Sequence, residues 1–207
     1  MLFLLLNPQL VVQPPPQPAL EQLQASGSVQ LVRRGEIATI SMRVPVPPER
    51  AWAVLTNYAR TFAAMPDVAA VQLLSRQGRQ LRLQQVLQAP YTFGLRINVL
   101  LEGEENPQSR NLRYRLVRGE NIRELSGEWT LSEDAGGTLV RHTIQLTPEI
   151  PGLLQSSFRS LHDASLRQSF ETLRQLMLAP SLSDNRLPSN SVTTTTTPRP
   201  LSVKAKG

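Results

Sequence analysis

The chain has 207 residues, and its apolar fraction of 40% is enough for one core, which suits one domain of about 150 residues with tails. The absence of cysteine excludes disulfide frameworks, thiolate nucleophiles and cysteine-ligated zinc, and a total of two histidines argues against a histidine-rich metal site. The net charge of +6 comes almost entirely from arginine, which gives weak attraction to anionic surfaces. Neither a metal nor a cofactor is expected.

The two ends of the chain differ in composition from its middle. Residues 1–27 combine prolines and glutamine with small residues, and residues 180–207 contain a run of five threonines. Neither segment can bury enough apolar surface to fold, so both are expected to be disordered, around one domain over residues 28–179. The first six residues are apolar, but no basic residue precedes Arg33, which does not match a secretory signal. A membrane-touching segment and a misassigned start remain alternatives, and we expect a cytoplasmic protein, with a position peripheral to a membrane as the other option.

The domain is predicted to begin with a strand and two short helices. Residues 36–46 alternate apolar and polar side chains, as in a strand with one buried face. Pro47 and Pro48 end this strand and preset the first turn of a helix, whose apolar face includes Trp52. The second helix stops at Pro66.

Six further strands are predicted from alternating segments that are joined by turn residues. The Gln77-Gly78-Arg79 turn favours a hairpin, and Asp134-Ala135-Gly136-Gly137 forms the turn before the last strand. Consecutive short strands with tight connections indicate an antiparallel meander. The six strands are expected at residues 68–76, 80–88, 93–103, 111–118, 122–133 and 138–147.

A long helix is predicted over residues 153–178, where apolar side chains recur at helical spacing. A helix of about 25 residues is about 38 Å long, which is enough to lie across a strongly curved sheet. The sequence therefore predicts an α+β fold in which a curved antiparallel sheet of about seven strands wraps around a long C-terminal helix, with two short helices after the first strand.

A family resemblance rests on four segments. They are residues 46–58, which read Val-Pro-Pro-Glu-Arg-Ala-Trp-Ala-Val-Leu-Thr-Asn-Tyr, then Met65-Pro66-Asp67, Ser126-Gly127-Glu128-Trp129 and Gly136-Gly137-Thr138. Over residues 35–178 the chain resembles the START/SRPBCC superfamily, and within it the coenzyme-Q-binding and polyketide cyclase/dehydrase-like branch. The resemblance implies the helix-grip fold and a cavity for a hydrophobic molecule between the sheet and the long helix. Many relatives have Asp in place of Asn57, so this chain lacks one acid.

Strand alternation selects the side chains that should line this cavity. Aromatic residues there offer apolar contact and a polar tip that orients a ring or a carbonyl. His142 shares its face with apolar Val140 and Ile144, so its imidazole should point inward to donate to a ligand oxygen, act as a general base, or satisfy a buried neighbour. His162 is expected at the cavity mouth or in solvent. The expected ligand-binding set is Leu83, Leu95, Ile97, Tyr114, Trp129, His142 and Ile144 from the sheet, with Phe158, Leu161 and Ser165 from the helix.

Sequence motifs that indicate an enzyme are missing. The serines near the start of the long helix lack a Gly-x-Ser-x-Gly elbow, and the Gly136-Gly137-Thr138 segment leads into a strand, unlike a phosphate-binding loop. Glu102, Glu104 and Glu105 fall at a strand end and are expected to be solvated. No catalytic residue is assigned.

The outer face of the sheet carries an arginine cluster. Arg113 and Arg115 are expected either to pair with Glu124 and Glu128 or to contact phosphate groups of lipid or ribosomal RNA. Stacking aromatic residues are missing from that face, which argues against sequence-specific RNA reading, and no DNA binding is expected.

These observations, together with the resemblance, favour a monomer that binds or transports a hydrophobic small molecule, such as a lipid or prenylquinone, without catalysis. Two alternatives remain open. One is a polyketide cyclase or aromatase that uses His142 and Tyr114 as acid or base. The other is a ribosome- or membrane-associated regulator that uses its basic face.

Overall fold

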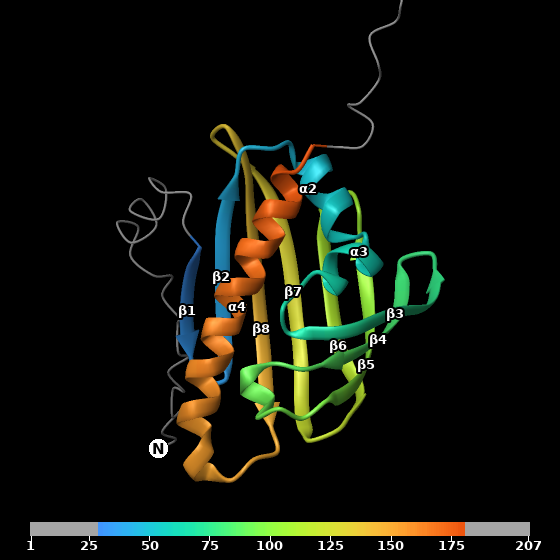
Figure 1. Cartoon of the computed structure of the whole chain (residues 1–207). Helices are drawn as coiled ribbons and strands as arrows, with labels where there is room; N and C mark the ends of the chain where they lie inside the picture. The colour runs from blue at the N-terminus through green and yellow to red at the C-terminus, as the bar shows by residue number, and fades with distance from the viewer. Residues whose placement is uncertain (1–28, 181–207) are drawn as a thin grey trace, which may run out of the picture.

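Eight antiparallel strands form a single curved sheet (Figure 1). The computed structural model describes residues 29–180, and the two segments expected to be disordered lie outside this range apart from Pro180. The spatial order is β1-β2-β8-β7-β6-β5-β4-β3, so β1 and β3 are the edges of the sheet. The strands are β1 (Gln30–Arg34), β2 (Ile37–Val44), β3 (Val68–Gln77), β4 (Gln80–Leu87), β5 (Ile97–Asn106), β6 (Asn111–Gly119), β7 (Ile122–Asp134) and β8 (Gly137–Pro148).

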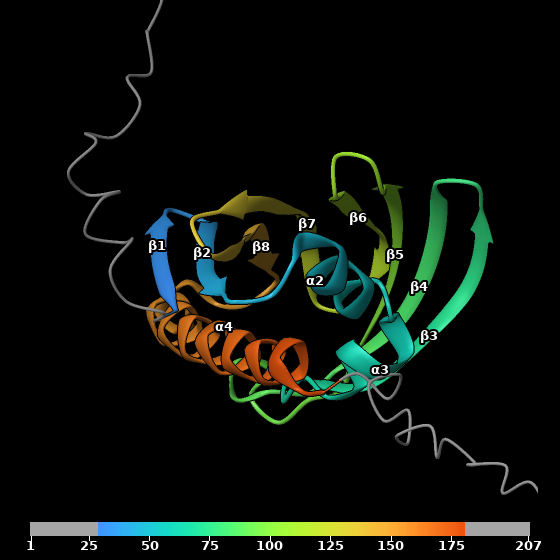
Figure 2. The ribbon, with the colours of Figure 1, turned by 90° about the horizontal axis from the view of Figure 1, so that it is seen from above.

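Helices cover the concave side of this sheet. Seen from above, the strands form an arc, and the long helix α4 (Gln155–Leu178) lies across its open side (Figure 2). The short helices α2 (Pro48–Leu55) and α3 (Tyr58–Ala63) connect β2 to β3, and two 3₁₀ turns, η1 (Pro90–Thr92) and η2 (Gly152–Leu154), precede β5 and α4. Helix α2 begins with proline in its first turn because that position needs no N–H donor. The predicted helix-grip fold is therefore confirmed.

The core lies between the sheet and α4. In β2, every second residue from Ala38 to Val44 is buried, and these side chains face the helix. In α4, the buried positions recur at three- and four-residue spacing, from Phe158 through Phe170 to Met177, as a single apolar stripe requires. Full burial of one such side chain contributes about 1.5 to 3 kcal/mol, so this stripe fixes the helix against the sheet.

The structure adds one strand to the predicted set and shortens another. Strand β1 was not expected, because it is short and forms only by pairing with β2 across a tight turn in which Gly35 has a φ of +60°. Strand β5 begins at Ile97, since Pro90–Thr92 forms a 3₁₀ turn and Phe93 and Gly94 have φ angles of 53° and 83°. The expected start of this strand at residue 93 is therefore wrong.

Glu105 is buried, although the sequence indicated a solvated side chain. Only 7% of Glu105 is exposed, and its carboxylate accepts hydrogen bonds from the Tyr58 hydroxyl and the Arg76 guanidinium. Burial and the neighbouring carboxylate raise the pKa of Tyr58, so its hydroxyl remains a donor. Glu105 thus ties helix α3 to strands β3 and β5.

Replacing Glu105 by alanine is expected to lower the free energy of unfolding by about 2 to 3 kcal/mol, because a buried tyrosine hydroxyl and an arginine lose their acceptor. The measurement is urea denaturation at neutral pH. Glu104→Ala is the matched control, since the Glu104 side chain is 52% exposed and lies 3.7 Å from Arg79; it should change stability by less than about 1 kcal/mol. Equal losses in the two variants would contradict this role of Glu105.

Candidate functional site

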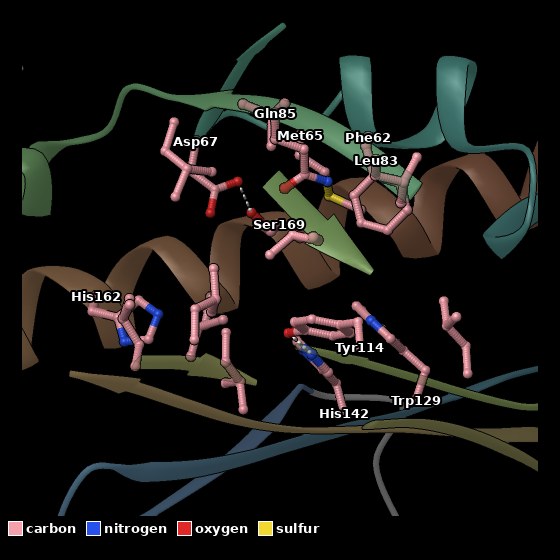
Figure 3. A pocket seen from close by; sticks show the side chains of 18 of the residues that line it. Phe62, Met65, Asp67, Leu83, Gln85, Tyr114, Trp129, His142, His162 and Ser169 are labelled. Atoms are coloured by element: carbon pink, nitrogen blue, oxygen red, sulfur yellow. Dashed lines mark hydrogen bonds between the residues drawn. The ribbon is translucent and has the colours of Figure 1, made fainter. Parts of the chain in front are cut away.

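A mostly apolar cavity lies between the concave face of the sheet and helix α4 (Figure 3). The centre of a water molecule can reach a volume of about 110 Å³ inside it. A single water needs about 10 to 15 Å³ by this measure, so the space accepts a small organic group. Its apolar walls include Leu81, Leu83, Leu101, Leu112, Leu125 and Ile144, and its polar residues are Asp67, Gln85, Tyr91, Tyr114, His142, His162 and Ser169.

The residues predicted to bind a ligand fall into two groups. Leu83, Tyr114, Trp129, His142 and Ile144 line the cavity. The other five lie elsewhere: Ile97, Phe158 and Ser165 are buried, Leu161 packs at the edge of the core, and Leu95 is 56% exposed.

The position of Leu95 corrects the expectation that it faces inward. It follows the left-handed residues Phe93 and Gly94, and its backbone N–H donates to the carbonyl of Thr92 at 3.1 Å. Leu95 therefore belongs to a turn before β5, where strand alternation does not apply.

A stack of rings forms the sheet side of the cavity. Trp129 and His142 are cross-strand partners on β7 and β8, and their ring centroids lie 3.9 Å apart with planes 5° from parallel. Phe170 of α4 stacks on Trp129 at 5.4 Å. The Tyr114 hydroxyl lies 2.8 Å from Nε2 of His142. Helix and sheet thus hold His142 in one orientation.

Gly127 explains how Tyr114 reaches His142 across strand β7. Tyr114 on β6 pairs with Gly127 on β7, and the phenol ring lies over this glycine. A Cβ atom at position 127 would be 2.4 Å from the tyrosine oxygen. Any larger residue there would displace Tyr114, so the absence of a side chain at Gly127 creates this part of the site.

His142 is neutral at physiological pH. Burial lowers its pKa to about 3, with a smaller contribution from the charge of His162. Its Nδ1 atom is buried and has no hydrogen-bond partner. An uncharged imidazole that is stacked on Trp129 can hold Tyr114 in place, and it is a weak base.

His162 also lines the cavity, and only 2% of it is exposed, so of the two expected positions, the cavity mouth or solvent, the solvent position is wrong. Arg33 of β1 causes the difference: its Nη2 lies 2.9 Å from Nδ1 of His162, and its Nε donates to Asp163 at 2.7 Å. Burial, followed by the charge of Arg33, lowers the pKa of His162 to about 4, while Asp163 acts in the opposite direction. The Tyr91 ring packs edge-on against the His162 ring, with the two ring centroids 5.1 Å apart.

Asp67 supplies a carboxyl group on the side of the cavity opposite Tyr114 and His142, as Figure 3 shows. Ser169 of α4 donates to its Oδ1 at 3.0 Å. Burial raises the pKa of Asp67, and hydrogen bonds from Ser169, Ser165 and Tyr91 partly oppose this shift. The Met-Pro-Asp motif marks this residue in the sequence, although strand and helix periodicity do not assign its side chain to the site. Gln85 shares the inward face of β4 with Leu83, so strand alternation could have found it, whereas Tyr91 lies in the η1 turn and carries no such signal.

Two arginines on the outer face of the sheet, Arg113 and Arg115, are paired. Arg113 contacts Glu128 at 2.8 Å, which is one of the expected ion pairs. Arg115 contacts Glu102, which is not one of the two acids expected to pair with it. Glu124 instead accepts a hydrogen bond from Gln145 at 2.7 Å, so its expected pairing with an arginine is wrong. Such exposed pairs contribute about 0 to 1 kcal/mol.

Metal-binding clusters and membrane spans are both missing from residues 29–180. In this range, no cluster of three or more His, Asp or Glu side chains is placed to hold a metal ion. None of the helices within the same residues combines the length and the apolar character that a membrane span requires.

Comparison with solved structures extends these observations. TTHA0849 from Thermus thermophilus aligns with a TM-score of 0.63 at 21% identity, covering 69% of this chain and 97% of that one. The Zhui aromatase/cyclase from a Streptomyces species aligns with a TM-score of 0.56 at 14% identity, covering 68% of this chain and 90% of that one. A START superfamily protein from Mycobacterium smegmatis aligns with a TM-score of 0.54 at 12% identity, covering 66% of this chain and 95% of that one. At these identities the likeness concerns the fold.

Sequence comparison gives the family. No curated protein matches the chain. Residues 37–177, which run from β2 almost to the end of α4, match the model of the family described as polyketide cyclase/dehydrase and lipid transport. The chain therefore belongs to this family, within the START/SRPBCC superfamily.

Proposed function

We propose that the protein binds a hydrophobic small molecule in the cavity and carries or stores it without changing its covalent structure. The observation that carries this proposal is the apolar cavity between the sheet and α4, with few polar groups at fixed positions, which is the usual construction of a small-molecule site. Its volume of about 110 Å³ suits a ring or a short chain segment. An intact lipid or prenylquinone requires the wall side chains to move outward.

The acid–base properties of the two histidines support binding over catalysis. A general base works best when its pKa is near the operating pH, and the pKa values of His142 and His162 are about 3 and about 4. One observation favours the cyclase alternative: Asp67 is a cavity carboxyl whose pKa burial raises, which improves it as a base. The two functions can be told apart by whether the bound molecule is chemically changed, since a carrier leaves it intact and a cyclase converts it.

The test is to purify the full chain from a lipid-rich host, identify co-purifying molecules by native mass spectrometry, and extract them. A stoichiometric hydrophobic molecule is expected, and it should be recovered unchanged after incubation with the protein. Ile144→Phe, which fills the cavity from β8, should lose it. Arg113→Ala with Arg115→Ala is the surface control and should retain it, because both arginines are paired on the outer face.

Three outcomes would count against carriage. Retention of the molecule by a folded Ile144→Phe variant would place the binding site elsewhere. Salt-sensitive binding lost with the two arginines would favour an anionic partner. Conversion of the molecule by the wild type and not by Asp67→Asn would favour the enzyme.

A further inference from the structure

We propose that both histidines are held as the neutral tautomer with hydrogen on Nε2, which makes the cavity a hydrogen-bond donor site for an uncharged apolar ligand with an accepting carbonyl oxygen, such as a ketone or quinone. This inference rests on the proposed function, because it names the polar feature of the molecule that the cavity binds.

Arg33 determines the tautomer of His162. The guanidinium nitrogen lies 2.9 Å from Nδ1, and a guanidinium has five N–H donors, no acceptor and a permanent charge. Nδ1 must therefore offer its lone pair, which places the single ring hydrogen on Nε2. Asp163 accepts from the same guanidinium at 2.7 Å, so Arg33 is fixed in this role. The N–H of His162 is turned away from Arg33, on a ring that lines the cavity.

The unpartnered nitrogen determines the tautomer of His142. Its Nε2 lies 2.8 Å from the Tyr114 oxygen, and either atom can be the donor. If Tyr114 donated, the hydrogen of His142 would be on Nδ1, which is buried without a partner. An N–H group that is buried without an acceptor is rare in proteins. The arrangement with Nε2–H donating to Tyr114 is therefore favoured.

The hydroxyl of Tyr114 is then free to donate to a ligand. Tyr114 lines the cavity, so a hydroxyl hydrogen that is not donated to His142 can be donated to a bound ligand. The hydroxyl of Ser169 is already directed at Asp67. A hydrocarbon offers the donors of Tyr114 and His162 no acceptor, whereas a ligand carbonyl oxygen offers one. Asp67 on the opposite wall disfavours a ligand carboxylate.

The tautomers can be measured directly, because the chain contains two histidines. Long-range ¹H–¹⁵N spectra of the ¹⁵N-labelled full chain near pH 7 should show two neutral imidazoles, each with a protonated Nε2 and an unprotonated Nδ1. His162→Gln assigns the two ring systems. A protonated Nδ1 in either ring, or an imidazolium, would overturn the proposal.

The ligand preference is tested with 1-tetralone and tetralin, which share a bicyclic skeleton and differ in the carbonyl oxygen. Isothermal titration of the full chain should show that the ketone binds about tenfold more tightly. Tyr114→Phe should reduce this ratio to near one. Tyr58→Phe, which removes a hydroxyl bonded to Glu105 outside the cavity lining, should preserve it.

The outcomes separate the two proposals. Equal binding of both probes by the wild type, or an unchanged ratio in a folded Tyr114→Phe variant, overturns the donor site and leaves cavity binding intact. Binding of neither probe overturns the proposed function and the donor site together.

Discussion

Acidification from pH 7 to pH 4.5 is expected to destabilise the protein by several kcal/mol, mainly through His142 and His162. Unfolded histidine has a pKa near 6.5, whereas the folded values are about 3 and about 4. Between these values the unfolded chain binds protons that the folded chain does not, so stability falls as the pH falls below about 6.5. At two pH units below 6.5, each histidine lowers the free energy of unfolding by about 2 to 3 kcal/mol.

The charged and titratable groups around the two imidazole rings also affect this pH dependence. His162 faces Arg33, Asp163 and Tyr91, and His142 faces Tyr114 and the rings that stack on it. Asp67 acts in the opposite direction. Its pKa is raised in the folded state, so the folded chain binds a proton at a higher pH than the unfolded chain does, and the contribution of Asp67 to stability increases as the pH falls. The measured loss should therefore be smaller than the sum of the two histidine contributions.

Urea denaturation at several pH values measures this effect. His142→Gln and His162→Gln should each flatten the curve between pH 6.5 and pH 4.5, and the double variant should flatten it further. A double variant that keeps the wild-type slope would show that other groups cause the acid sensitivity.

Gly127→Ala is expected to lower the free energy of unfolding by about 2 to 3 kcal/mol, as overpacking of a well-packed site does, and to break the contact between Tyr114 and His142. The added Cβ would lie 2.4 Å from the oxygen and 2.6 Å from Cζ of Tyr114, and 2.8 Å from the backbone carbonyl of Thr143. The phenol can swing aside into the cavity, but the carbonyl belongs to the paired strand β8. The substitution therefore affects stability and ligand space together.

Thermal and urea unfolding measure the stability change, and titration with 1-tetralone measures the effect on the site. Gly152→Ala is the matched control, because no atom lies within 4 Å of the added Cβ, and it should be nearly neutral. The double variant Gly127→Ala with Tyr114→Ala should lose less stability than the sum of the two single losses, since Tyr114→Ala removes one of the two clashes. A Gly127→Ala protein as stable as the Gly152→Ala protein would show that β7 and β8 accommodate the methyl group.

The sequence by itself determined the architecture. Alternation in residues such as Ala38 to Val44 records which face of a strand is apolar, and the stripe from Phe158 to Met177 records the buried face of a helix. Pro47 and Pro48 determine where the strand ends and the first helix begins. These signals are local, since each depends on neighbours within a few residues of the chain. They predicted the antiparallel strands and the long helix, and the family resemblance implied their helix-grip arrangement.

Only the tertiary structure decided the state of the polar residues. His162 is buried because Arg33, which is 129 positions away in sequence, pairs with it, and Glu105 is buried because Tyr58 and Arg76 donate to it. Leu95 is apolar, as an inward-facing residue usually is, but it lies in the turn before β5 and is not part of the strand. A periodic pattern specifies which residues prefer to leave water, whereas the partner that lets a polar group be buried is supplied by strand register and by contacts between distant elements.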